Sequence, residues 1–426
     1  MSLKKRVLVF PCGSEIGLEL HRSLGRAKEV VLFGGASVPD HGEYVYSRYI
    51  GGIPFVDAPD FIEALNAVIR ENSIDYVFPA HDSVVLALAK AYEQGLLACR
   101  VLTSSHSTCR ICRSKKNTLE LFNGVLRVPA LYGSVADVKA WPVFLKPDVG
   151  QGSKGAQKAE NADICALLLK RAADLLIMEY LPGPEFTVDC FTDASGELIF
   201  CQPRTRARIM NGISVKTAPV SRPDLNEMAG IINGKLSLRG AWFFQVKEAE
   251  DGQPALMEIA PRVAGAMGFC RGAGVNLPLM TIYDAEGYTV SAMPNPEMRE
   301  MDRALSNMFR FDYDYSHVYV DLDDCLICGG QVNTELAAFL YQCINKNISL
   351  RLLTRHAGEL DETLSKHRLV GLFDEIIHLK MGESKASAIK HLPAIFIDDS
   401  FAERLDVRKN FSIPVFAPDA VEGLII

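Results

Sequence analysis

The sequence lacks the features that mark membrane, secreted and nucleic-acid-binding proteins. None of its 426 residues lie in an apolar stretch approaching the roughly 20 residues that span a bilayer. The start, Met1-Ser-Leu-Lys-Lys, has no apolar core of a signal peptide. The net charge is −7, and no run of basic residues is long enough to indicate nucleic-acid binding. Repeats and low-complexity tracts are also absent. We therefore expect a cytoplasmic globular protein whose ligands are small molecules.

Disulfides and a structural zinc site are not expected either. The eleven cysteines are an odd number scattered through apolar runs, which is typical of a reducing compartment. Two C-x-x-C pairs occur, Cys109/Cys112 and Cys325/Cys328, but more than 200 residues separate them. Zinc ligands are normally spaced more closely. We interpret these cysteines as buried or incidental thiols.

The N-terminal hundred residues alternate apolar strands with helical segments. Strands are expected at 6–10, 30–34 and 76–79, with helices following near 59–71 and 82–94. This alternation predicts a parallel sheet with both faces covered. The glycine turn after the first strand lacks the G-x-G-x-x-G spacing of a dinucleotide site. His81 and Asp82 stand at the mouth of a strand, where they can contact substrate, although Asp82 can equally cap the next helix.

The pattern changes to α+β from about residue 106 to 290. Antiparallel strands are expected near 186–194, 197–203, 213–218, 240–248 and 254–259. Arg204, Arg206 and Arg208 alternate, so their guanidinium groups would share one strand face. Such a cluster is either a clamp for a carboxylate or phosphate or a solvated edge. A turn is expected at 211–214, and the proline-bearing segment 293–302 is either a linker or a final surface segment.

A lysine and a glycine-rich loop follow one another at 143–155. A short apolar run ends at Lys146, and the loop Gly150-Gln-Gly-Ser-Lys-Gly155 comes four residues later. Glycines allow the backbone N–H groups to approach and cradle phosphate oxygens, and a lysine adds a mobile positive charge. Three further segments follow in order, at 176–189, 242–247 and 256–262.

This ordered set resembles the ATP-grasp superfamily, in the style of carbamoyl-phosphate synthase and biotin carboxylase, over roughly residues 1–290. The resemblance implies ATP and Mg²⁺ as cofactors and assigns the α-phosphate to Lys146 and magnesium to Gln245 and Glu258. It implies that Arg262 steadies the transferring phosphoryl group. The nucleotide-binding residues that it implies are Lys116, Gly150, Gln151, Gly152, Ser153, Lys154, Gly155, Glu179, Tyr180, Leu181 and Glu185. Oxygen ligands suit magnesium, and cations suit phosphoryl transfer.

Two points of this resemblance stay open. Lys115 competes with Lys116 for the role of the earlier nucleotide lysine, because both stand at a probable helix start. Ala260 occupies the place where the family commonly has an asparagine that binds the second metal. Its presence leaves room for a weakened or altered catalytic centre.

A second chemical centre is expected near the C-terminus. A strand ends in the D-x-D pair Asp321 and Asp323, and residues two apart share a strand face. A second strand ends at Thr354, Lys385 opens a helical stretch, and a third strand ends at Asp398 and Asp399. This order resembles the haloacid dehalogenase superfamily of phosphatases over residues 316–426.

The phosphatase resemblance implies a role for each of these residues. Asp321 would be the nucleophile, Asp323 the general acid/base and Thr354 a phosphate-binding hydroxyl. Lys385 would neutralise charge, with Lys380 as the alternative. The magnesium ligands would be Asp321, Asp323 and Asp398, with Asp399 as a further candidate. Magnesium suppresses the repulsion between an aspartyl nucleophile and phosphate. About 110 residues leave little room for a substrate-selecting cap.

The sequence thus predicts an α/β multidomain protein. Residues 1–105 would form a Rossmann-like domain, 106–312 an α+β ATP-grasp domain, and 313–426 a small doubly wound domain like haloacid dehalogenases. The hypothesis is a ligase that activates a small carboxylate as an acyl phosphate for an amine, fused to a phosphatase for a related phosphorylated metabolite. A homodimer is compatible with it. The alternatives are an ATP-binding sensor without turnover and a phosphatase with an accessory ATP-grasp unit.

Overall fold

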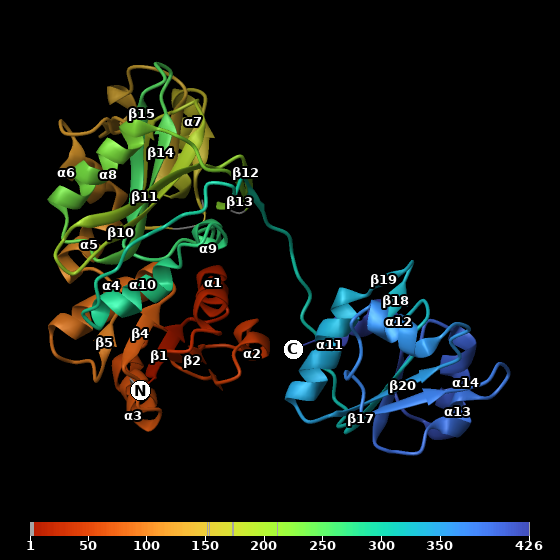
Figure 1. Ribbon diagram of the computed structural model, residues 1–426. Coiled ribbons are helices and arrows are strands. Elements are labelled where there is room, and N and C mark those ends of the chain that lie inside the picture. The colour runs from red at the N-terminus through yellow and green to blue at the C-terminus, as the bar shows by residue number, and fades with distance from the viewer. Residues whose placement is uncertain (1–3, 151, 153, 173, 211, 426) are drawn as a thin grey trace. The chain divides into compact units, whose positions relative to one another are not determined.

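The computed structural model describes residues 4–150, 152, 154–172, 174–210 and 212–425. The chain divides into two compact units, Met1–Ser306 and Asn307–Ile426 (Figure 1). The further division of the first unit after residue 105 stays a prediction. Among the described residues, no helix is long and apolar enough to cross a membrane.

A parallel five-stranded sheet opens the first unit, in the order β3-β2-β1-β4-β5. Its elements are β1 (Lys5–Phe10), α1 (Glu15–Leu24), β2 (Val30–Gly35), α2 (Gly42–Val45), β3 (Tyr49–Ile50), α3 (Phe61–Glu71), β4 (Tyr76–Pro79), α4 (Asp82–Glu93) and β5 (Arg100–Val101). Val7 and Val9 pack into one apolar cluster, and Leu8 and Phe10 pack into another. Because alternate residues of β1 enter different clusters, both sheet faces are covered, as the sequence predicts.

A four-stranded antiparallel sheet, β6-β9-β7-β8, carries the predicted phosphate lysine. The elements of this region are α5 (His106–Arg113), α6 (Lys115–Phe122), β6 (Leu131–Tyr132), the 3₁₀ helix η1 (Val135–Asp137), β7 (Val143–Pro147), β8 (Gln157–Ala159), α7 (Ala162–Arg171) and β9 (Leu175–Glu179). The buried residues Val143 and Leu145 alternate along β7 and pack with Leu168 of α7. Lys146 therefore points to the face opposite that apolar cluster.

A second antiparallel sheet, β11-β10-β14-β15, forms the centre of the unit (Figure 1). It is accompanied by the small sheet β12-β13-β16 and three helices. These elements are β10 (Glu185–Thr192), β11 (Leu198–Thr205), β12 (Arg208–Met210), β13 (Ile213–Thr217), α8 (Pro223–Lys235), β14 (Gly240–Glu248), β15 (Pro254–Ala260), α9 (Gly268–Gly272), α10 (Leu277–Ala285) and β16 (Met301–Asp302). Val188, Trp242 and Phe244 pack against Leu225 and Ile232 of α8, so the other face of this sheet remains for a site.

The expected strands of this region are confirmed to within a few residues. The segment 293–302 ends in β16, which pairs with β13, so it is a final surface segment of the first unit and not a linker.

The second unit is built on a parallel sheet in the order β21-β20-β17-β22-β23. Its elements are β17 (His317–Val320), β18 (Ile327–Cys328), β19 (Gln331–Val332), α11 (Thr334–Asn345), β20 (Ser349–Thr354), α12 (Leu360–Lys366), β21 (Glu375–His378), α13 (Lys385–Ala388), β22 (Ala394–Ile397), α14 (Phe401–Phe411), β23 (Val415–Phe416) and the 3₁₀ helix η2 (Pro418–Leu424). Val318 and Val320 face one apolar cluster and Tyr319 faces another. The carboxyl ends of β17, β20 and β22 consequently lie at one edge of the sheet.

Candidate active sites

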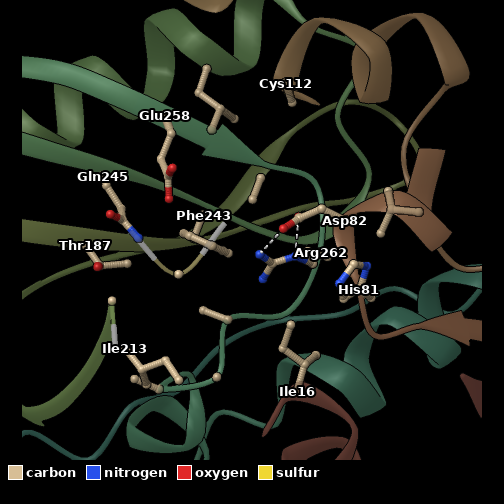
Figure 2. Close-up of a pocket in the computed structure, with 18 of the residues that line it drawn as sticks. Ile16, His81, Asp82, Cys112, Thr187, Ile213, Phe243, Gln245, Glu258 and Arg262 are labelled. Atoms are coloured by element: carbon tan, nitrogen blue, oxygen red, sulfur yellow. Dashed lines mark hydrogen bonds and ion pairs between the residues drawn. The ribbon is translucent and has the colours of Figure 1, made fainter. Parts of the chain in front are cut away.

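A cavity of about 270 Å³ opens in the first unit, between the central sheet and the starts of α1 and α4. Figure 2 shows its two sides, with Phe243 between them. One side carries Glu258, Gln245 and Thr187, and the other carries Asp82, Arg262 and His81. The cavity also receives Lys115, Arg113, Arg204 and Arg206. Cations predominate, so the cavity suits an anionic ligand.

Four of these side chains form a row across the central sheet. In the strand register Arg204 lies opposite Thr187, Thr187 opposite Gln245, and Gln245 opposite Glu258. Directly opposed residues project from the same face of a sheet. The side chains of Gln245 and Glu258 form no hydrogen bond or ion pair with other described residues. Their free oxygens are ligands that Mg²⁺ accepts, so this pair fits the metal site that the sequence predicts.

Lys146 is buried beside this row. Burial and, to a smaller extent, Lys115 lower the pKa of Lys146 to about 8, although Glu258 and Glu185 partly offset both effects. A buried ammonium group with a lowered pKa is stabilised by an incoming anion. The position of Lys146 therefore suits a phosphate group.

The structure corrects the choice between the two neighbouring lysines. The Nζ atom of Lys115 donates to the carbonyl oxygen of Asp148 at 3.1 Å and lines the cavity. Lys116 is exposed and pairs with Glu120 on its own helix at 3.9 Å. Adjacent helical residues point about 100° apart, so only Lys115 faces the site. The choice depends on which face of α6 points toward the cavity, and the sequence alone does not determine that.

The glycine-rich loop reaches this cavity through Gly150 and Gly152. Lys154 and Gly155 are exposed, and Gln151 and Ser153 lie outside the described residues. Arg113, which the sequence analysis missed, donates from Nη1 to the carbonyl oxygen of Gly150 at 3.2 Å. No local pattern distinguishes this arginine, because its role comes from the tertiary contact.

Two of the predicted nucleotide-binding residues, Glu179 and Tyr180, are engaged with protein partners. The Glu179 carboxylate accepts from Arg127 at 2.5 Å and from the backbone N–H of Ala130 at 3.0 Å. Its side chain is thus occupied, and its backbone N–H donates to the carbonyl oxygen of Ala130 at 2.9 Å. Leu181 is buried. Lys158 lies over the Tyr180 ring at 4.5 Å.

Glu185 is shared between two cations. Its carboxylate lies 3.2 Å from Nε of Arg206 and 3.1 Å from Nζ of Lys247. A ribose hydroxyl would therefore meet a carboxylate that is already charge-neutralised.

The expectation that three arginines share one strand face is wrong. The strand β11 ends at Thr205 and β12 begins at Arg208, so the alternation stops between them. Arg204 is 1% exposed and pairs with Asp189, whereas Arg208 is exposed and pairs with Asp302 at 2.5 Å. Only Arg204 and Arg206 line the cavity.

Arg262 meets Asp82 across the cavity wall. Its Nε and Nη2 atoms donate to the two Asp82 oxygens at 2.5 and 2.8 Å (Figure 2). Asp82 is the first residue of α4 and does not cap it; the His81 side chain accepts from the Ser83 N–H instead. Ala260 is buried at the end of β15 and offers no metal ligand there.

A second cluster lies at the carboxyl edge of the parallel sheet in the second unit. Oxygen atoms of Asp321, Asp398 and Asp399 lie within 4.8 Å of one another. Lys385 bridges two of them, at 2.8 Å from Asp321 and 2.7 Å from Asp398. Burial and, to a smaller extent, Asp398 raise the pKa of Asp321 to about 6 against the opposing effect of Lys385. The three carboxylates repel one another and offer the oxygen ligands that Mg²⁺ prefers, so the cluster fits a Mg²⁺ ion.

The remaining predicted residues of this cluster surround the same edge. Thr354 is fully buried, and its Oγ1 atom has no hydrogen-bond partner among the described residues. Asp323 is half exposed and contacts His356, a residue that the sequence analysis missed. Lys380 is exposed, whereas Lys385 is buried, so the structure favours Lys385. The eleven cysteines are free thiols.

Comparison with known proteins identifies the fold of the first unit. Residues 171–304 match the family described as ATP-grasp in the biosynthetic pathway with Ter operon. This part of the chain is therefore similar to an ATP-grasp domain. No curated protein matches it significantly in sequence.

Solved structures resemble this chain at low sequence identity. The biotin carboxylase domain dimer of Hydrogenobacter thermophilus 2-oxoglutarate carboxylase, solved with MgADP, ADP and bicarbonate, is 16% identical, with a TM-score of 0.57, over 71% of this chain and 73% of that one. Staphylococcus aureus N5-carboxyaminoimidazole synthetase with ADP is 14% identical, with a TM-score of 0.56, over 69% and 81%. Bacillus licheniformis L-amino acid ligase is 14% identical, with a TM-score of 0.54, over 69% and 78%. These likenesses establish the fold.

Proposed function

We propose that the first unit is a ligase that uses ATP and Mg²⁺ to convert a small carboxylate into an acyl phosphate. The main supporting observation is that Lys115, Gln245 and Glu258 line one anion-binding cavity, and that buried Lys146 interacts electrostatically with Glu258 and Lys115. The relatives with this fold include structures with bound ADP and magnesium. Within this proposal ATP supplies the leaving group, and an amine attacks the activated carbonyl.

Each residue of the cavity has a separate role in the proposed phosphoryl transfer. Lys146 and Lys115 hold the phosphates, and the backbone of Gly150 and Gly152 approaches them closely. Gln245 and Glu258 would hold magnesium, which supplies charge neutralisation when bound. Arg262, oriented by Asp82, lies where it can contact the transferring group. Neutralising charge at a preorganised site is the main source of catalysis in such reactions.

We also propose that the second unit is a magnesium-dependent phosphatase for a metabolite related to the ligase reaction. The support is the group of three aspartates with Lys385, together with the unpartnered hydroxyl of Thr354. Asp321 would attack phosphorus and expel the alcohol, which takes a proton from Asp323. Water would then cleave the aspartyl phosphate. The bound magnesium would offset the charge of phosphate against these carboxylates.

The neighbouring lysines provide a matched test of the ligase proposal. We expect carboxylate-dependent ADP release to fall at least tenfold in Lys115→Ala and to stay within twofold in Lys116→Ala, because only Lys115 reaches the cavity. Release should be unchanged in Asp321→Asn, which belongs to the second unit. Equal losses in the two lysine variants, or ADP release independent of any carboxylate, would overturn the proposal.

A further inference from the structure

One donor in the cavity wall has no acceptor. The Nε and Nη2 atoms of Arg204 donate to Asp189 at 2.6 and 3.2 Å, and Asp189 also accepts from Cys270 Sγ at 3.4 Å. Both ionised side chains are almost completely buried. The Nη1 atom of Arg204 has no hydrogen-bond partner among the described residues. Because buried polar groups in folded proteins are nearly always paired, a ligand or an enclosed water supplies the missing acceptor.

Arg204 differs in this respect from Arg206 and Arg262, which also line the cavity. Arg262 uses Nε and Nη2 for Asp82 and Nη1 for the carbonyl oxygen of Val263. Arg206 donates from each nitrogen to Glu185, Thr187 or the carbonyl oxygen of Gly212. Arg113 is only partly buried and donates to the carbonyl oxygen of Gly150 and to Oγ of Ser83. Among the described residues, Arg204 is thus the arginine of the cavity wall with a fully buried nitrogen that has no partner.

The charge around Arg204 favours an anion as the acceptor. Arg204, Arg206 and Lys247 carry three positive charges, against two negative charges on Asp189 and Glu185. Among these directly paired groups the positive charges outnumber the negative ones by one, and Glu258 is the next carboxylate that acts on Arg206. A hydrogen bond from a guanidinium group to an ionised acceptor is about twice as strong as a neutral one.

The place of Arg204 in the sheet separates it from the expected reaction centre. Arg204 and Glu258 end the same four-strand row, so three strand spacings of about 4.8 Å each set their backbones roughly 14 Å apart. A carboxylate that reacts with ATP lies at the Gln245–Glu258 end, beside the phosphates. A group that meets Arg204 is then distinct from the carboxylate that is activated.

We propose that the ligase substrate carries two carboxylates, one that is activated and a second that Arg204 Nη1 binds. This inference rests on the proposed function and adds the class of its substrate, a diacid. The cavity of about 270 Å³ has room for a small metabolite of this kind between the two ends of the row.

The test compares each diacid with its own monoamide. The probes are succinate, glutarate, aspartate and glutamate, with succinamate, glutaramate, asparagine and glutamine as their partners. Binding to the full-length protein with ADP and Mg²⁺ is measured by calorimetry, and KM is measured from ADP release. The variants are Arg204→Lys, which keeps a cation beside Asp189, and Arg208→Lys as the exposed control. A double variant, R204Q with D189N, removes both charges together and guards against misfolding.

We expect at least one diacid to bind tenfold or more tightly than its monoamide. Arg204→Lys should remove most of that difference and leave MgADP binding within twofold, while Arg208→Lys changes neither. Equal binding of diacids and monoamides would show that Nη1 meets only an enclosed water, and would overturn the inference, as would failure of every diacid to bind. Selective diacid binding without any ADP release would uphold the subsite and refute the ligase proposal.

Discussion

Asp82 accepts two hydrogen bonds from Arg262, although 180 positions of sequence separate them. The contact ties the first turn of α4 to the chain just beyond β15. Burial raises the pKa of Asp82, but the Arg262 guanidinium outweighs this effect and keeps that pKa below its ordinary value. The Arg262 guanidinium is consequently held in a fixed orientation at the cavity, with its charge paired to Asp82.

Removing the charge of Asp82 should destabilise the first unit. We expect Asp82→Asn to lower the free energy of unfolding by about 1–3 kcal/mol, because a largely buried guanidinium loses its charged acceptor. Asp302→Asn is the matched control, since its pair with Arg208 is exposed and such pairs contribute only about 0–1 kcal/mol. Urea unfolding measures both. Equal destabilisation in the two variants would contradict the importance given to the buried pair.

Gly212, just before β13, lies against Gly152 of the glycine-rich loop. Gly212 has a φ of +77°, and a β-carbon at that position would lie 2.5 Å from the carbonyl carbon of Gly152. Gly252 has the same φ, but a β-carbon there would meet nothing within 4 Å. Gly212→Ala should therefore raise the KM for ATP at least tenfold, and Gly252→Ala should leave it unchanged. If the two variants have the same KM for ATP, the loop contact does not shape the nucleotide site.

The lowered pKa of Lys146 predicts that the protein takes up a proton when nucleotide binds. Its pKa is about 8 in the free protein, against an ordinary value of 10.5, because it is buried. Phosphates favour the charged form, so MgATP binding above pH 8 should take up close to one proton, and binding at pH 6.5 should take up almost none. Calorimetry in buffers of different ionisation enthalpy measures this uptake. Lys146→Arg stays protonated, so persistent uptake in that variant would assign the proton elsewhere.

The same shift predicts the sign of one contribution to stability. Between pH 8 and 10.5 the unfolded chain binds the Lys146 proton and the folded free protein does not. The destabilisation caused by burying this charge is therefore complete below pH 8 and is relieved as the pH rises through that range.

His356 is held between Asp323 and α12. Its Nδ1 atom lies 2.9 and 3.0 Å from the two Asp323 oxygens, and its Nε2 atom lies 2.8 Å from Oγ1 of Thr363. If Asp323 protonates the leaving alcohol, fixing its carboxylate matters most for poor leaving groups. His356→Gln should slow the hydrolysis of phenyl phosphate at least tenfold more than that of p-nitrophenyl phosphate. His391→Gln is the control at the opposite end of β17. Equal slowing of both esters would argue against this role.

Strands and their order along the chain could be predicted because their signals are local. The continuous apolar run of β1 indicates a sheet that is covered on both faces, and the chain builds one. The alternation of Arg204, Arg206 and Arg208 misled the prediction because strand periodicity holds only while the strand lasts. The end of β11 at Thr205 depends on tertiary pairing, which no local pattern encodes.

Contacts between distant segments account for what the sequence could not supply. Lys115 and Lys116 have identical local chemistry, and only the packing of α6 decides which one faces the cavity. The local sequence around Asp82 indicates a helix cap, but its carboxylate accepts hydrogen bonds from Arg262 instead. His356 carries no motif of its own, and its relation to Asp323 appears only when β17 and β20 pair.

The most direct test of the account is trapping of the acyl phosphate. The protein is incubated with ATP, Mg²⁺, hydroxylamine and a pool of small carboxylates that includes the diacids, and hydroxamates are sought by mass spectrometry. We predict a hydroxamate that disappears in Lys146→Ala and persists in Asp321→Asn. A protein that binds MgATP but forms no hydroxamate with any carboxylate, or forms it equally in Lys146→Ala, would contradict the central claim.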